Sequence, residues 1–195
     1  MVVFIAKILS FFMPTARLRK NARRKLVLAF WTHCAKRQVK VHGKGFVATA
    51  RCGLTKQTEI GEGAILGGVS VLGAGKVKFG NYVSTGPNVV IQTQSHEYEG
   101  EMLPYGVGYR VKDVEIGDAA WIGMNVLILP GTKIGEGAII QAGSVVHGEI
   151  PPCAIAGGNP AKVFAWRDKA HYEKLKSQGA YFATNSRFIN GGVGV

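Results

Sequence analysis

An aliphatic residue followed by glycine or another small residue recurs every six residues through the middle of this chain. The pairs include Ile60-Gly61, Leu66-Gly67, Ile116-Gly117 and Ile122-Gly123. A six-residue period fits neither the alternation of a half-buried strand nor the spacing of an amphipathic helix. Repeats of this length are typical of a parallel β-helix, in which each coil buries its apolar side chains against its neighbours. The repeat therefore predicts an all-β solenoid.

The first position of each hexad predicts the side chains that point inward. With three hexads to a triangular coil, positions 60, 79, 116 and 134 share one wall, and positions 72, 91, 128 and 146 share another. The step from 72 to 79 is one residue too long, which a bulged corner absorbs. The step from 91 to 116 is nineteen residues too long, so an excursion leaves and re-enters at a corner. The expected inward residues are Ile60, Leu66, Leu72, Phe79, Thr85, Ile91, Ile116, Ile122, Ile128, Ile134, Ile140 and Val146.

Glycine or asparagine late in a hexad, as at Asn88 and Asn125, suits corners that need a positive φ. At 195 residues and 47% hydrophobic content, the chain is expected to form one domain with appendages. The expected parts are a basic amphipathic helical arm (1–40), the β-helix with its loop 92–115 (41–163), and a C-terminal helix and tail (164–195). Residues from Phe164 onward are expected to begin the short C-terminal helix.

The positive charge is concentrated at the N-terminus. Residues 1–45 hold eleven lysines and arginines and no acidic residue, whereas the remaining residues hold thirteen cations and twelve acids. Nucleic-acid binding is disfavoured, because no basic surface continues beyond the N-terminal arm.

Three cysteines without CxxC spacing indicate a reducing cytoplasm, without disulfides or zinc.

The mostly apolar segment 1–13 is too short to cross a bilayer, which takes about 20 residues, and it lacks the charge order of a signal peptide. A second helix is expected over about 16–36. Two interpretations of the N-terminal arm stay open. In the first, residues 1–25 lie peripherally on the anionic inner face of the plasma membrane. In the second, both helices pack on the β-helix or on a neighbouring subunit. The helix places the following residues on one face: Ala22, Leu26, Ala29, Phe30 and His33.

About half of the chain, residues 60–163, resembles the hexapeptide-repeat acyltransferases with a left-handed β-helix, especially the maltose and galactoside O-acetyltransferases. The resemblance implies a left-handed coil, a homotrimer, and acetyl-CoA as cosubstrate in the groove between neighbouring β-helices, with no metal required. The N-terminal arm resembles that of acetyltransferases from polysaccharide and O-antigen gene clusters, which implies a sugar or glycan acceptor. The motifs that carry the resemblance are the run from Glu115 to Gly123, Leu129-Pro130-Gly131, the run from Ala142 to Val146, and the run from Gly158 to Val163.

Acyl transfer to a hydroxyl needs a general base, a role that histidine suits because its ordinary pKa lies near the working pH. His96 opens the excursion in Gln94-Ser95-His96-Glu97, where the family places its catalytic base. A carboxylate or a backbone carbonyl should hold the other ring nitrogen, with Glu97 and Glu101 as candidates. Glu101 and Met102 match the galactoside group's loop, which implies contact with the substrate.

The resemblance also assigns contacts to the two substrates. Trp121 matches a tryptophan that lines the active site beside the catalytic loop. Gly123, Met124 and Ala142 match positions that contact the pantetheine arm of CoA. His147 and Gly148 stand where the group often has Thr-Lys. Lys162 matches a basic residue near the nucleotide phosphates, with Arg167 as a weaker candidate.

Three other functions are weighed against this one. A γ-class carbonic anhydrase needs three zinc-binding histidines, two of them close together at the subunit interface, and His96 has no histidine partner in its loop. A xenobiotic O-acetyltransferase acting on chloramphenicol or streptogramins shares the histidine loop, Trp121 and the Asn-Pro-Ala-Lys turn. A noncatalytic β-helix scaffold would not require His96 on so long an excursion.

Overall fold

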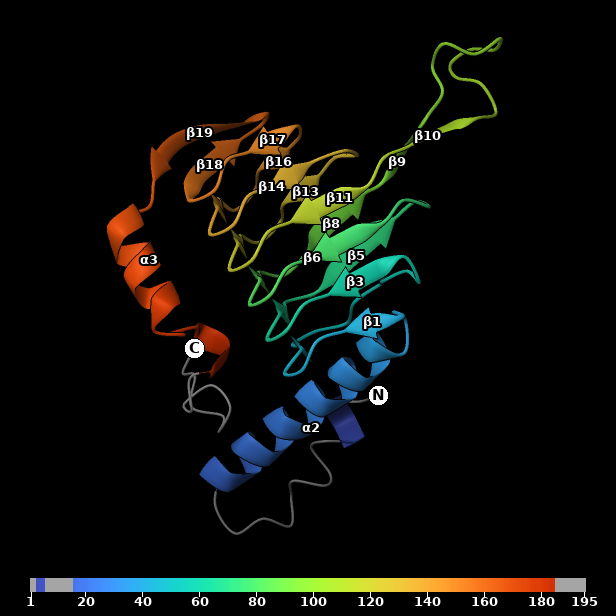
Figure 1. Cartoon of the computed structure of the whole chain (residues 1–195). Coiled ribbons are helices and arrows are strands. Elements are labelled where there is room, and N and C mark those ends of the chain that lie inside the picture. The colour runs from blue at the N-terminus through green and yellow to red at the C-terminus, as the bar shows by residue number, and fades with distance from the viewer. Residues whose placement is uncertain (1–2, 6–15, 185–195) are drawn as a thin grey trace.

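The computed structural model describes residues 3–5 and 16–184, and shows a parallel β-helix with one helix across its N-terminal end and another beside it (Figure 1). Three parallel sheets form its walls. Wall A contains β1 (Val41–His42), β3 (Thr58–Ile60), β6 (Val77–Phe79), β11 (Val114–Ile116), β14 (Lys133–Ile134) and β17 (Glu149–Ile150). Wall B contains β2 (Val47–Ala48), β4 (Ile65–Leu66), β7 (Ser84–Thr85), β12 (Trp121–Ile122), β15 (Ile139–Ile140) and β18 (Ala154–Gly158). Wall C contains β5 (Val69–Leu72), β8 (Val89–Gln92), β13 (Leu127–Ile128) and β16 (Val145–Val146).

The register confirms the solenoid that the repeat predicts. On wall A, Ile60 pairs with Phe79, Phe79 with Ile116, and Ile116 with Ile134, all four of them buried. Each fully buried aliphatic side chain contributes roughly 1.5–3 kcal/mol relative to an exposed one. The stacked column is therefore the main source of cohesion between coils. The corner prediction is also confirmed, because Asn88 and Asn125 have φ values of 58° and 55°.

One inward position is wrong. Leu72 is 51% exposed, and Val71 occupies the core position opposite Ile91. Strand β5 buries Val69 and Val71 and exposes the alternate residues. In a strand, a shift of one residue moves a side chain to the other face. The corner before β5 is thus one residue shorter than the hexad predicts, and the corner after it is correspondingly longer.

The helix expected over about 16–36 is confirmed as α2 (Ala16–Lys36), which packs across the N-terminal end of the solenoid (Figure 1). It packs through Trp31 and Ala35, which contact the core. Thr32 strengthens the contact, because its Oγ1 accepts from the backbone N–H of Ala48 at 3.0 Å. The apolar face expected from the sequence is the opposite one, where Leu26 and Phe30 are 42% and 39% exposed.

The C-terminal helix begins later than expected. Residues Phe164 to Trp166 belong to β19 (Ala161–Trp166), which pairs antiparallel with β18. Helix α3 (Lys169–Ser177) starts after Asp168, whose carboxylate accepts from the backbone N–H of His171 at 2.9 Å. These residues form a strand because they pair with the otherwise open edge of β18. The helix begins after Asp168 because its carboxylate caps the first turn. A 3-10 turn at Phe182–Thr184 follows, and residues 185–195 of the expected tail lie outside the described residues.

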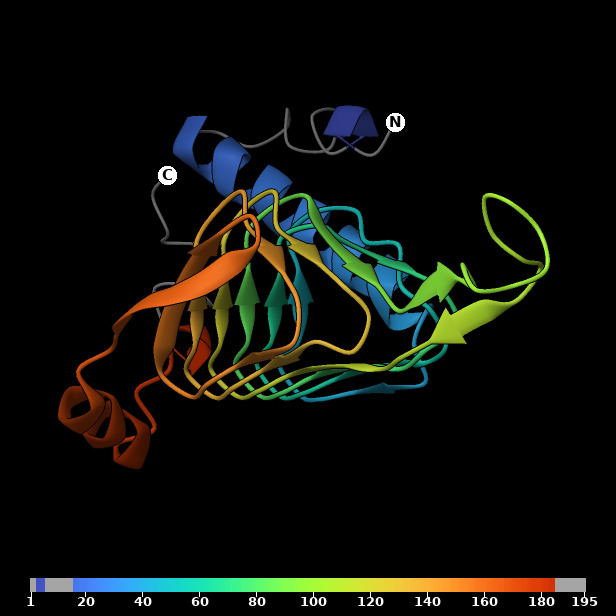
Figure 2. The same ribbon diagram turned by 90° about the horizontal axis from the view of Figure 1, so that it is seen from above.

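The expected excursion is a β-hairpin. We call this hairpin the arm, and we always call the segment 1–40 the N-terminal arm. It contains β9 (Gln94–His96) and β10 (Tyr109–Val111), paired antiparallel, and projects from the corner that joins wall C to wall A. Figures 1 and 2 both show the arm and α3 extending from opposite sides of the solenoid. Residues carried by the arm are thereby separated from those next to α3.

Candidate functional site

The arm places His96 at the end of β9, opposite Tyr109 on β10. Backbone hydrogen bonds continue beyond the strands, because the N–H of Glu97 donates to the carbonyl of Gly108 at 3.0 Å, and the N–H of Gly106 donates to the carbonyl of Glu97 at 2.7 Å. His96 therefore lies on hydrogen-bonded backbone, and the hairpin rather than an irregular loop determines where its ring points.

Two tyrosines enclose the His96 ring. The Tyr105 ring stacks on it with centroids 3.8 Å apart and an interplanar angle of 19°, and the Tyr109 ring lies 4.7 Å away at 35°. The Nδ1 atom of His96 is buried and has no hydrogen-bond partner among the described residues. Since Nδ1 is buried, Nε2 is the nitrogen better placed to meet a substrate. Neither tyrosine was among the residues predicted from the sequence, although the three tyrosines of the excursion, Tyr98, Tyr105 and Tyr109, were a usable signal.

The carboxylates proposed to orient His96 do not contact its ring. Glu97 Oε1 instead accepts from Arg110 Nε at 2.7 Å, and Arg110 also pairs with Glu99. These hydrogen bonds raise the pKa of Arg110 above its ordinary value. The guanidinium lies 4.4 Å from the centroid of the Tyr98 ring. The Arg110 and Glu97 side chains of this ion cluster are about one-third exposed and that of Glu99 is 69% exposed, and the cluster links the two sides of the arm. Glu101 and Met102 are exposed near the tip of the arm.

The predicted pantetheine contacts gather at a different corner, where wall B passes into wall C. Gly123 and Ala142 stack one coil apart, because a Cβ on Gly123 would lie 2.5 Å from the backbone nitrogen of Ala142. The carbonyl of Met124 accepts from the N–H of Gly143 at 2.9 Å, and the Met124 side chain is 47% exposed. The sequence assigned Gly123 to the approach of a ligand, and the structure adds a second reason, the spacing between coils.

Lys162 lies near the same corner. It pairs with Gly157 in the β18–β19 hairpin, and its side chain is exposed. Next to it, the N–H of Gly158 donates to Ser144 Oγ at 3.2 Å, which joins this hairpin to the coil that carries Ala142. His147, in contrast, follows β16 at the corner between walls C and A. The structure thus groups Lys162 with the pantetheine contacts and places His147 on the side from which the arm projects.

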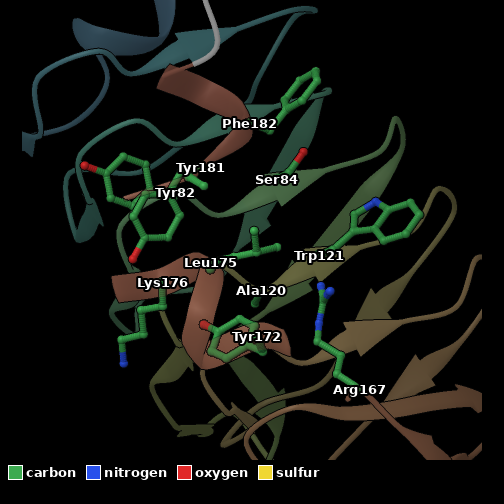
Figure 3. Close-up of a pocket in the computed structure, with 12 residues that line it drawn as sticks. Tyr82, Ser84, Ala120, Trp121, Arg167, Tyr172, Leu175, Lys176, Tyr181 and Phe182 are labelled. Atoms are coloured by element: carbon green, nitrogen blue, oxygen red, sulfur yellow. The ribbon is translucent and has the colours of Figure 1, made fainter. Parts of the chain in front are cut away.

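Trp121 lies on the outer face of wall B, where it is 54% exposed. It borders a cavity of about 460 Å³ between wall B and the C-terminal segment, shown in Figure 3. Neither His96 nor any other residue of the arm lines this cavity. A single chain therefore does not bring Trp121 and His96 together.

The C-terminal segment is held against the corner between walls A and B. Arg167 Nε donates to the carbonyl of Gly137 at 2.6 Å, and the Tyr172 hydroxyl donates to Glu136 Oε1 at 3.0 Å. Burial, followed by this hydrogen bond and the charge of Glu136, raises the pKa of Tyr172 above its ordinary value. The Tyr82 and Tyr181 rings stack 3.9 Å apart at 7°. No sequence pattern predicts this cavity, because its walls are far apart along the chain.

Within residues 3–5 and 16–184, no group of three or more His, Cys, Asp or Glu side chains is arranged to hold a metal ion. All three cysteines are free thiols, and burial raises the pKa of Cys52 and Cys153.

The fold and the repeat define a hexapeptide-repeat β-helix protein. Residues 113–148 match the family described as bacterial transferase hexapeptide (six repeats). The chain is similar to the galactoside O-acetyltransferase of Escherichia coli K12, with 38% identity over 50% of this chain and 49% of the relative. It is also similar to that of Lactococcus lactis, with 40% identity over 43% of this chain and 40% of the relative.

Among solved structures, the chain is similar to a hexapeptide-repeat-containing acetyltransferase of Vibrio cholerae O1 biovar eltor complexed with acetyl coenzyme A. The TM-score is 0.56 at 24% identity, over 85% of each chain. This likeness concerns the fold. The chain spans about half the length of the curated relatives it matches. The resemblance to the hexapeptide-repeat acetyltransferases and the parallel β-helix are thus confirmed.

Proposed function

We propose that this protein is an O-acetyltransferase that transfers acetyl from acetyl-CoA to a hydroxyl of a sugar or glycan, with His96 as general base. The observation that carries the proposal is the His96 ring, held between two tyrosines on an arm that leaves an otherwise regular solenoid. The named relatives support the reaction class, and the acetyl-CoA bound to the Vibrio cholerae protein supports the donor.

In the proposed reaction, His96 Nε2 takes the proton of the acceptor hydroxyl as its oxygen attacks the thioester carbonyl. The C–S bond then breaks, and the imidazolium returns the proton to the departing sulfur, which gives the acetyl ester and free CoA. Pantetheine would lie along the corner with Gly123, Met124 and Ala142, and Lys162 would meet the nucleotide phosphates. Met102 and Glu101 would border the acceptor from the arm.

The test is release of free thiol from acetyl-CoA with a panel of acceptors. His96→Ala should lower kcat by about 100-fold to 10,000-fold, the usual contribution of a general base, with an unchanged Kd for CoA. Full activity of this variant would remove His96 from the mechanism. Turnover of chloramphenicol in preference to glycans would assign the xenobiotic reaction, and a chain that does not bind CoA would be a scaffold.

We also propose a homotrimer whose sites lie between chains. The supporting observation is that the arm with His96 and the outer face with Trp121 lie on different sides of the solenoid (Figure 2). Coexpression of His96→Ala with Trp121→Ala tests this arrangement. Sites shared between two chains regain activity in mixed trimers, because some interfaces contain both native residues. Activity no higher than that of the single variants would exclude a shared site.

The N-terminal arm is proposed to contact the cytoplasmic face of a membrane. The exposed face of α2 carries Leu26 and Phe30, and Val3 to Ile5 are also exposed. Arg23, Arg24 and Lys25 adjoin them on α2. Each such cation near an anionic surface contributes about 1 kcal/mol. No helix among the described residues is long and apolar enough to cross a membrane. Residues 1–2 and 6–15 of segment 1–25 lie outside the described residues.

Liposome sedimentation separates the membrane from a neighbouring subunit as the partner of this face. Phe30→Ser should reduce binding to vesicles with anionic phosphatidylglycerol and leave the trimer intact. Val41→Ser, which changes an exposed apolar residue of wall A, is the matched control. Dissociation of the trimer by Phe30→Ser, with unchanged vesicle binding, would assign this face to subunit contact.

A further inference from the structure

The cavity beside Trp121 has the size and the walls of a small-molecule site. Its volume of about 460 Å³ lies within the range of about 300–1,000 Å³ that is typical of ligand pockets. One wall is the outer face of wall B, with Ser84 and Trp121, and the other is the C-terminal segment (Figure 3). The exposed indole of Trp121 offers a flat apolar surface of the kind against which the apolar face of a ring can pack.

The two cationic side chains at the cavity, Lys176 and Arg167, differ in their interactions with neighbouring residues. Lys176 Nζ pairs with Glu136 Oε1 at 2.6 Å, and the hydrogen bond to that carboxylate raises the pKa of Lys176. Arg167 uses its Nε–H on the carbonyl of Gly137. In the described part of the chain, no carboxylate lies within ion-pair distance of the Arg167 guanidinium. Lys176 is thus paired with a carboxylate, whereas the Arg167 guanidinium lies 5.8 Å from the centroid of the Tyr172 ring and has no carboxylate partner among the described residues.

The Arg167 side chain is also positioned for a ligand. Its Nε hydrogen bond anchors the guanidinium, and Figure 3 shows the Nη end pointing toward Trp121. A guanidinium held in this way presents two parallel N–H donors, which suit the paired oxygens of a carboxylate or a phosphate. The side chain is half-buried, so a charge-assisted hydrogen bond there is less weakened by solvent than one on an open surface.

We propose that this cavity binds the acceptor, and that the acceptor is a sugar bearing an anionic group, a carboxylate or a phosphate, which Arg167 holds while the ring lies against Trp121. That the bound sugar is an acceptor rests on the proposed acetyltransferase function. The acidic class of the sugar and the role of Arg167 in specificity are additional to that function. The hydroxyl to be acetylated would extend from the cavity toward the arm of a neighbouring chain.

Titration calorimetry on the full chain tests binding without any turnover. The probes are glucuronic acid for a carboxylate, glucose 1-phosphate for a phosphate, and methyl glucoside as the neutral sugar. We expect one of the anionic probes to bind at least ten-fold more tightly than methyl glucoside. Arg167→Met should abolish this preference, because a hydrogen bond to a charged group contributes enough for a roughly ten-fold change in Kd. Arg51→Met, at an exposed corner, is the matched control and should leave the preference unchanged.

Because Arg167 also anchors the C-terminal segment, a second variant is needed. Trp121→Ala acts on the opposite wall and should weaken binding of all three sugars, with the thermal midpoint of each variant measured alongside. Equal affinity for neutral and anionic sugars would overturn the proposal, even if acetyl transfer is observed. A loss of CoA affinity in Arg167→Met, with unchanged sugar affinity, would assign Arg167 to the cosubstrate and also overturn it. Anion-selective binding without acetyl transfer would support the site and remove the enzymatic function instead.

Discussion

Gly123→Ala tests whether the small residues of the repeat are required by the spacing between coils. A Cβ at this position would lie 2.5 Å from Ala142 N, 2.8 Å from Ala142 Cα and 2.9 Å from Ile140 O. All three atoms belong to the backbone of the next coil, so no side-chain rotation relieves the contact. The two coils must separate, which also lengthens the 2.8 Å hydrogen bond from the N–H of Gly123 to Ile140 O.

The expected loss of stability follows from these two effects. Overpacking costs about 3 kcal/mol when only the backbone can move, and the weakened hydrogen bond adds about 1 kcal/mol. Gly143→Ala is the matched control, because its φ is 74° and a Cβ there meets nothing within 4 Å. Its cost is the strain of a left-handed alanine alone, roughly 1–2 kcal/mol.

The assay is urea and thermal unfolding, followed by circular dichroism at matched protein concentration. For a chain of this size, 1 kcal/mol shifts the thermal midpoint by about 2–4 °C. Gly123→Ala should therefore lower the midpoint at least twice as far as Gly143→Ala does. An equal or smaller fall would refute the argument from coil spacing. A native midpoint combined with lost CoA binding would show that a ligand, rather than the neighbouring coil, requires this glycine.

Three further predictions concern the arm and the C-terminal segment. Tyr105→Leu should lower kcat and change KM little, because the His96 ring loses its stacking partner. Tyr105→Phe should keep most of the activity, and equal rates for the two variants would show that stacking on His96 does not contribute. Arg110→Gln should leave the urea midpoint nearly unchanged, since its ion pairs are partly exposed and screened by solvent, and a clear fall of the midpoint would contradict this. The raised pKa of Tyr172 means that its neutral form is favoured in the folded chain, so its contribution is complete below about pH 10 and falls as the pH rises further. Tyr172→Phe should consequently flatten the fall of the urea midpoint above that pH, and parallel curves for the two proteins would contradict the prediction.

The sequence predicted the solenoid because each inward residue is specified by its own hexad. Burial at Ile116, Ile122 and Ile128 requires only that the period persist from coil to coil. The same reasoning failed at Leu72, where two consecutive glycines precede the strand and the corner is shorter than the hexad. Periodicity therefore predicts regular coils well, and predicts poorly the coil whose corners have unequal lengths.

The sequence placed α2 correctly, but the apolar face that it indicated is not the face that packs on the solenoid. Leu26 and Phe30 form an apolar stripe as plausible as the one that contains Trp31 and Ala35. Two contacts decide between them, the hydrogen bond from Ala48 to Thr32 and the close approach that the small Ala35 permits. Both depend on the position of β2, which no property of the helix sequence encodes by itself.

By itself, the sequence determined that the chain coils, where the coil is interrupted, and that His96 stands at the interruption, because these features are local and periodic. Only the tertiary structure decided what surrounds the chemistry. Tyr105 lies against His96 because the hairpin folds back, and Arg167 lies near Trp121 because the C-terminal segment returns along the corner between walls A and B. Contacts between segments that are distant in the chain depend on the path of the whole backbone. No repeat, motif or spacing within one segment specifies them.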